Sequence, residues 1–230
     1  MLVLLALAAH GQDVATQYAY WLRYQIQVPI SPKLQWTSEI DNRRFFAPDV
    51  ALQFITHQRL HYRTGRWDFG GGVTYSIAFA QNPEEGFDQG ISEIRPVVEA
   101  SYEMPIHKFL MSNRMRIDDR FIQADRDQSV FEESVKIVRF RYRLQFRVPL
   151  KTNDRQQPTL SLRVGDEIML NNWKNTFDQN RIYATLDFVL SKKFSLETGY
   201  LYIYQQRFGR DEFYERHVLR LSLVHRISKK

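Results

Sequence analysis

The chain has 230 residues, of which 43% are hydrophobic and 25% charged, and its formal net charge is +6. This length suits one barrel or one ordinary domain. No cysteine is present, so disulfides, thiolate metal sites and cysteine nucleophiles are excluded. The positive charge alone would suit nucleic acid, but the arginines alternate along the chain instead of clustering, so we predict no nucleic-acid partner.

The N-terminus is a short apolar segment. Ala9 and Gly11 place small side chains at the two positions that signal peptidase inspects. We therefore expect residues 1–11 to be a secretory signal peptide that is cut before Gln12. The basic residues that usually precede the apolar core are missing, which suggests a truncated start. So short a segment cannot cross a bilayer as a helix. The alternative to a signal peptide is a buried N-terminal element.

The rest of the chain falls into stretches that alternate between polar and apolar residues, separated by turn-forming residues. No linker rich in glycine or proline divides it, so we expect a single domain over residues 12–230. The pattern predicts strands over residues 18–30, 34–45, 50–63, 67–80, 91–102, 109–120, 131–150, 159–170, 181–190, 194–204 and 217–227. Bacterial membrane barrels normally have an even number of strands, so we expect ten or twelve, with a miscount at the long stretch 131–150.

Short and long connections take turns between these strands. The short ones are residues 31–33, 64–66, 105–108 and 191–193, and the long ones are residues 81–90, 121–130, 171–180 and 205–215. An outer-membrane barrel has this asymmetry, with tight periplasmic turns and longer external loops. Residues 151–158 are the exception, because they are long where a short turn is due.

The stretch from Arg139 to Leu150 has the clearest alternation. Its arginines fall on one face of an extended strand, and Phe140, Tyr142 and Leu144 fall on the other. A helix would spread the arginines around its axis, whereas a two-residue repeat sorts them to one side. A closed sheet with one polar and one apolar face is one of the two structures that can cross a bilayer.

Alternation alone does not say which face points inward, and a soluble lipocalin-like barrel with an apolar interior is the rival architecture. Three features favour the membrane version: more than eight strands, a strongly ionic polar face, and aromatic rings near strand ends. These rings include Tyr18, Tyr20, Trp36, Trp67, Tyr200, Tyr202 and Tyr204. We therefore predict an all-β, antiparallel transmembrane barrel of the outer-membrane type with a charge-filled lumen.

Acidic residues and arginines are interleaved on the face that we assign to the lumen. The predicted lumen charge network is Glu39, Arg43, Arg59, Glu93, Arg95, Glu99, Arg114, Arg116, Asp118, Arg139, Arg141, Arg143, Glu167 and Arg181. In a narrow barrel, guanidinium and carboxylate groups can pair across the interior and fill it. One interpretation is a packed polar core, and the other is a narrow pore in which the excess of arginines favours anions.

Spacing argues against an enzyme or a metal site. His217 and Ser222 differ by an odd number and so lie on opposite faces of one strand. His57 and His61 share a face, but four residues along a strand span about 13 Å, too far for one metal ion. We therefore predict no catalytic residue, no metal and no cofactor.

The run Asp178–Gln179–Asn180–Arg181 is the cluster of polar side chains that most resembles a reactive site. An Asp/Asn-rich run before a strand is usually a turn whose side chains bond their own backbone. We therefore predict a turn here, after which Arg181 enters the lumen near Glu167 of the preceding strand.

Several ordered stretches are typical of a known family. They are Trp21–Tyr24, Glu93–Pro96, Arg114–Phe121, Arg139–Tyr142, Glu167, Phe177–Arg181, Gly199–Tyr200 and His217. With these residues the chain resembles DUF2490, an uncharacterised bacterial outer-membrane family predicted to form a β-barrel. The family more often has His and Glu where this chain has Asn113 and Asp118. The resemblance implies fold and location, and it transfers no activity.

The last strand, from Val218 to Ile227, alternates like the assembly signal of outer-membrane barrels, with Ile227 in the place of the usual terminal aromatic residue. We expect the barrel-assembly machinery and outer-membrane lipid to be its partners. The expected protein is a monomer in the outer membrane of a Gram-negative bacterium, either structural or a narrow, porin-like, anion-preferring channel. An outer-membrane lipid-modifying enzyme and a soluble periplasmic ligand-binding barrel are the alternatives.

Overall fold

The computed structural model describes residues 14–79, 81–83, 90–125, 127, 129–207 and 212–227. The expected signal peptide, residues 1–11, and its cleavage point lie outside these residues. The described part forms β1 (Val14–Pro29), β2 (Leu34–Phe45), β3 (Ala51–Thr64), β4 (Trp67–Ala78), β5 (Ile91–Ile106), β6 (Phe109–Gln123), β7 (Ser134–Thr152), β8 (Pro158–Asn171), β9 (Phe177–Val189), β10 (Phe194–Gln206) and β11 (Phe213–Arg226). Among these residues, no helix is long and apolar enough to cross a membrane.

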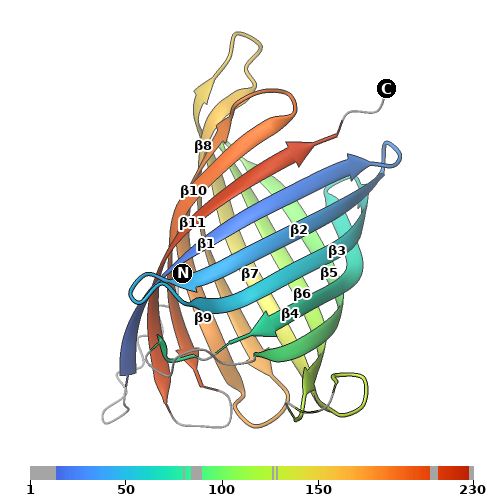
Figure 1. Cartoon of the computed structure of the whole chain (residues 1–230). Coiled ribbons are helices and arrows are strands. Elements are labelled where there is room, and N and C mark those ends of the chain that lie inside the picture. The colour runs from blue at the N-terminus through green and yellow to red at the C-terminus, as the bar shows by residue number, and fades with distance from the viewer. Residues whose placement is uncertain are drawn as a thin grey trace.

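The strands close into one barrel in which each strand pairs with its neighbours in sequence (Figure 1). All these pairs are antiparallel except the closing pair, in which β1 runs parallel to β11 from Val14↔Phe213 to Gln27↔Arg226. The expectation of an even number of strands is therefore wrong for the described chain. An even number is needed only when the first and last strands are antiparallel, and a parallel closure allows eleven.

The connections at the two ends of the barrel differ in length (Figure 1). At the short-turn end the strands are joined by residues 30–33, 65–66, 107–108, 153–157 and 190–193. At the long-loop end the strands are joined across residues 46–50, 79–90, 124–133, 172–176 and 207–212, some of which lie outside the described residues. This confirms the expected alternation. The exception expected at residues 151–158 is smaller than predicted, because β7 continues to Thr152 and β8 begins at Pro158.

The barrel carries its apolar face outward and its charged face inward. In β7, Phe140 is 49% exposed and Tyr142 is 41% exposed, whereas Arg139 is buried. The same distribution holds in the other strands, where exposed Leu, Ile, Val and aromatic residues alternate with buried polar ones. A soluble lipocalin-like barrel needs the opposite arrangement, so the fold is an outer-membrane-like barrel.

Aromatic side chains ring the outer surface near both ends, as predicted. At the short-turn end, Trp67 lies against Tyr102, with ring centroids 4.9 Å apart. At the long-loop end, Tyr18 stacks on His217 at 5.2 Å. Such belts suit the two interfaces of a membrane.

The lumen also holds one apolar region that the alternation did not predict. It comprises Ala19, Trp21, Phe45, Leu52, Leu201, Ile203 and Val218. These residues come from the strands on both sides of the parallel seam between β1 and β11. The side of the lumen next to the seam is therefore partly apolar. Many of the charges of the lumen come from the other side, from β5 to β9.

Candidate functional site: the charged lumen

All fourteen predicted lumen charges lie on the inner face of the barrel. They come from β2 and β3 (Glu39, Arg43, Arg59), β5 (Glu93, Arg95, Glu99), β6 (Arg114, Arg116, Asp118), β7 (Arg139, Arg141, Arg143), β8 (Glu167) and β9 (Arg181). The inward positions of each strand repeat every two residues. The strand period therefore brings together residues that are far apart in the sequence.

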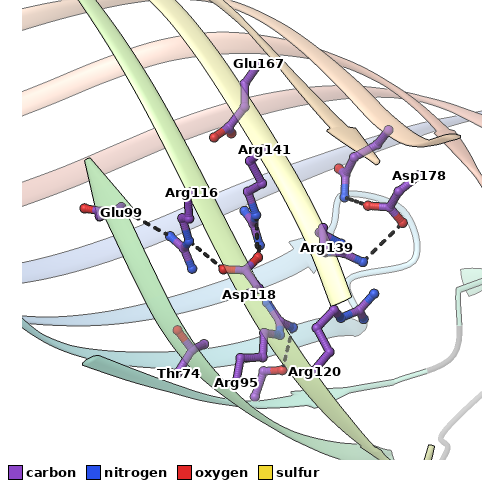
Figure 2. A network of polar contacts seen from close by, with 12 residues as sticks. Thr74, Arg95, Glu99, Arg116, Asp118, Arg120, Arg139, Arg141, Glu167 and Asp178 are labelled. Atoms are coloured by element: carbon purple, nitrogen blue, oxygen red, sulfur yellow. Dashed lines mark hydrogen bonds and ion pairs between the residues drawn. The ribbon is translucent and has the colours of Figure 1, made fainter. Parts of the chain in front are cut away.

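Asp118 is the centre of the largest cluster (Figure 2). It is fully buried and accepts hydrogen bonds from Arg116 Nε at 2.6 Å and Arg141 Nε at 2.5 Å. Arg116 and Arg141 are direct cross-strand partners in β6 and β7. Like charges in that position repel, so the single carboxylate holds the pair together.

Glu93 also holds two arginines, and it lies closer to the long-loop end than Asp118 does. Its carboxylate pairs with Arg120 and accepts a hydrogen bond from Arg95 Nη2 at 2.7 Å. Arg95 also donates to Ser76 Oγ at 2.9 Å. This cluster therefore joins β4, β5 and β6 through the lumen.

Residues 178–181 are not the predicted turn, because they belong to β9. Asp178 is buried and accepts a hydrogen bond from Arg139 Nη2 at 3.2 Å and another from Gln179 Nε2 at 3.1 Å. The carboxylate therefore binds a lumen arginine instead of the backbone of a turn. The prediction for Arg181 is confirmed, since its Nη1 lies 3.9 Å from Glu167 Oε2.

Several ion pairs reach past an intervening strand, and the pair between Arg114 and Glu167 is one of them. Arg114 on β6 donates to Glu167 on β8 at 2.5 Å, although β7 lies between those strands. Arg114 Nη1 lies 3.7 Å from Glu99 Oε2. The guanidinium therefore crosses part of the lumen and connects β5 to β8.

The β1 to β3 side of the lumen has its own charge cluster. Arg23 binds both oxygens of Asp41, at 2.6 and 2.8 Å. Arg43 donates to Asp41 at 3.1 Å, and Glu39 lies 3.5 Å from Arg23 and 3.7 Å from Arg59. A bidentate fork of this kind fixes the orientation of both side chains.

Sequence reasoning missed Trp21 as a lumen residue. The Arg43 guanidinium carbon lies 3.8 Å from its ring centroid, and that of Arg181 lies 5.4 Å away. The signal was available, because Trp21 is two residues from Arg23 and therefore shares its face. Arg43 of β2 and Arg181 of β9 therefore both contact the indole of Trp21.

Two arginines of β11 were also missed. Arg216 is buried and donates to Gln17, Gln205 and Gln81 at 2.6, 2.6 and 2.9 Å. Arg220 donates to Thr185 Oγ1 at 3.2 Å. The alternation of residues 216, 218, 220 and 222 would have found both.

A cavity of about 540 Å³ lies in the lumen. Fifteen arginines and four glutamates line it, and none of the lining residues lies in or next to a short turn. Arg143 faces this cavity, and within the described chain no carboxylate lies within 4.0 Å of it. Its cross-strand neighbour Glu167 is engaged by Arg114 and Arg181 instead.

His217 and Ser222 lie on opposite faces of β11. Ser222 is fully buried inside the barrel, whereas His217 lies outside and its Nδ1 is 2.5 Å from Tyr200 Oη. Inside, His57 bonds Thr74 at 2.6 Å and His61 bonds Asp68 at 2.9 Å. In the described ranges, no group of three His, Cys, Asp or Glu residues could hold a metal ion.

Comparison with known proteins supports the family resemblance. The model of a family described as "Protein of unknown function (DUF2490)" matches residues 18–214. Among curated proteins, none matches the chain.

Two solved barrels are similar at low identity. The β domain of the Bordetella autotransporter BrkA is 10% identical, with 84% of this chain and 81% of that chain covered and a TM-score of 0.47. OmpT of Vibrio cholerae, expressed in the outer membrane, is 11% identical, with 78% and 58% covered and a TM-score of 0.39. The assignment of the fold rests on the strand pairing described above.

Proposed function

This chain belongs to the DUF2490 family, and we propose that it is an outer-membrane β-barrel whose arginine-rich lumen admits anionic solutes. The outward apolar face and the aromatic belts at both ends support a location in the membrane. In lipid, a closed barrel leaves no unpaired backbone edge. The long-loop end then faces the outside of the cell and the short-turn end faces the periplasm.

The observation that carries the anion preference is the imbalance of charge around the cavity. Its lining has fifteen arginines against four glutamates. Asp118, which is not part of this lining, already pairs with two arginines. Three arginines of the lining, Arg143, Arg216 and Arg220, make no ion pair with a carboxylate in the described chain. A narrow lumen with surplus positive charge concentrates anions and repels cations.

A sealed structural barrel is the second candidate. The cavity lining supports it, because this lining contains no residue that lies in or next to a short turn. The belt of ion pairs through Glu99, Arg116 and Asp118 is almost fully buried, so water has little room beside these side chains. In this version the charges only fill the lumen. We propose no catalytic role in either version.

Reversal potentials in planar bilayers test the proposal. Under a KCl gradient, the purified protein is expected to conduct with a reversal potential of the sign set by chloride. Replacing two of the arginines that lack a carboxylate partner, Arg143→Gln with Arg216→Gln, is expected to move that potential toward zero. The matched control is Lys136→Gln, because Lys136 lies on the outer side and pairs with Asp119. Cation selectivity would contradict the proposal, and a barrel that inserts without conductance would favour the sealed version.

A further inference from the structure

The outer surface of β6 to β9 carries a carboxylate in the middle of the membrane-facing zone. Asp166 is exposed and lies near the middle of β8, between Val164 and Ile168, which are each 37% exposed. The other outward charges of the described strands, Arg44, Asp119, Lys136 and Glu215, lie near the long-loop end. An ionisable side chain at this depth is costly, and such residues usually have a functional partner.

Two hydrogen-bonded pairs make up this polar patch, which we define as Asn113, Tyr142, Asp166 and Asn180. Asn180 Nδ2 donates to Asp166 Oδ1 at 2.6 Å, and Tyr142 Oη donates to Asn113 Oδ1 at 2.7 Å. Within the described chain, the second carboxylate oxygen of Asp166 and the amide nitrogen of Asn113 have no partner. One pair therefore lacks a donor and the other lacks an acceptor. Lipid tails supply neither.

We propose that the polar patch is the interface with a second copy of this chain. The neighbouring order of the strands is β6, β7, β8, β9. A two-fold axis parallel to the barrel axis, between β7 and β8, places β6 and β7 of one copy opposite β9 and β8 of the other. The donor-bearing pair of each copy then faces the acceptor-bearing pair of its partner, and symmetry makes the contact twice.

The complementarity selects this occupant over lipid. Headgroups carry donors, but they lie at the rims with the aromatic belts, not at mid-span. Polar groups that bond between membrane segments are a recognised cause of association in lipid. The inference replaces the expected monomer with a dimer, and it rests on the proposed membrane location but not on the passage of anions.

Single-cysteine cross-linking tests the dimer, because the natural chain has no cysteine. Leu144 lies on β7 and is the cross-strand neighbour of both Asn113 and Asp166. Leu144→Cys, treated in outer-membrane fractions with a short bismaleimide, is expected to give a dimer of this chain. The matched control is Ile40→Cys, which changes an outward residue of β2 that is 45% exposed, and it is expected to give little dimer.

A second substitution separates the interface from folding. Adding Asp166→Leu to Leu144→Cys is expected to lower the dimer fraction roughly tenfold, because both symmetry-related contacts lose their acceptor. Leucine suits a lipid-facing site, so the variant is expected to insert as well as its parent, which a heat-dependent gel shift measures separately.

The proposal is overturned if Leu144→Cys gives no more dimer than Ile40→Cys, or if Asp166→Leu leaves the dimer unchanged. A cross-link from Leu144→Cys to a protein of another size also overturns it. Loss of the heat-dependent shift in the parent itself would instead refute the membrane barrel, so the two failures are distinguishable.

Discussion

At the scale of the residue, the lumen is organised by acids that each hold more than one arginine. Asp118, Glu93 and Asp41 each contact two guanidinium groups. Without the shared carboxylate, arginines that face one another across neighbouring strands would repel. The acids are therefore the positions where a single substitution does most damage.

Asp118→Ala is expected to lower the free energy of unfolding by about 3–5 kcal/mol, because it leaves two buried arginines without their carboxylate. Urea unfolding of the protein in lipid vesicles, followed by tryptophan fluorescence, measures this change. Adding Arg141→Ala to Asp118→Ala is expected to restore part of the loss, since one of the orphaned charges is removed as well. A loss no greater than that of Asp154→Ala, in an exposed turn, would contradict the shared-carboxylate account.

Asp49, in the connection between β2 and β3, predicts a dependence on pH. A hydrogen bond from Arg44 Nε at 2.6 Å and a second from Tyr20 Oη at 2.8 Å lower the pKa of Asp49 below its ordinary value. Such a carboxylate stabilises the folded loop above its ordinary pKa of about 3.9, and that contribution is lost as the pH falls through the lowered value. NMR titration is expected to find this lowered pKa, and Arg44→Gln is expected to raise it. An ordinary pKa that Arg44→Gln leaves unchanged would refute the contact.

At the scale of the element, the two-residue period was enough to predict the strands and their inner and outer faces. The alternation also indicated eleven strands, but the usual even number of strands led us to expect ten or twelve. A parallel seam between β1 and β11, which permits an odd number, depends on closure and not on local pattern. The strand at residues 177–180 was missed because its Asp and Asn residues are typical of turns. The pair between Arg114 and Glu167 was out of reach, since it depends on how far a side chain crosses the lumen. The outward polar patch was also missed, because Asp166 interrupts an otherwise apolar face.

Gly72 on β4 predicts a strict requirement for glycine. A Cβ atom added there would lie 1.9 Å from the Gln58 carbonyl oxygen and 2.8 Å from Arg59 Cα. Gly72→Ala is therefore expected to block closure of the barrel, and the fraction of protein with a heat-dependent gel shift measures this. Gly71→Ala is the matched control, because its nearest heavy atom, the Val97 oxygen, is 3.8 Å away. Equal shifts for the two variants would show that β3 and β4 can separate at this point.

The last strand predicts recognition by the barrel-assembly machinery. Leu223 lies on the outer face of β11, and Ile227, just after the strand, is 39% exposed. Replacing both with Asp is expected to abolish insertion in cells, because charges take the place of the apolar residues of the signal. Replacing both with Val is the control and is expected to leave insertion normal. The amount of protein in the outer-membrane fraction measures both variants, and normal insertion of the Asp variant would refute the signal.

At the scale of the whole molecule, the distribution of polarity is that of a soluble protein turned inside out. Phe140 and Tyr142 face outward while Arg139 and Arg141 of the same strand face the lumen. Water could not stabilise such an outer surface, whereas lipid can. The charged lumen, the aromatic belts and the proposed dimer all depend on this orientation.

The gel mobility of the unboiled protein tests this orientation most directly. The chain, expressed behind a complete signal peptide, is expected in the outer-membrane fraction, with a fast-running band in SDS that slows after boiling. A protein that stays soluble in the periplasm and runs at one mobility before and after boiling would contradict the membrane barrel.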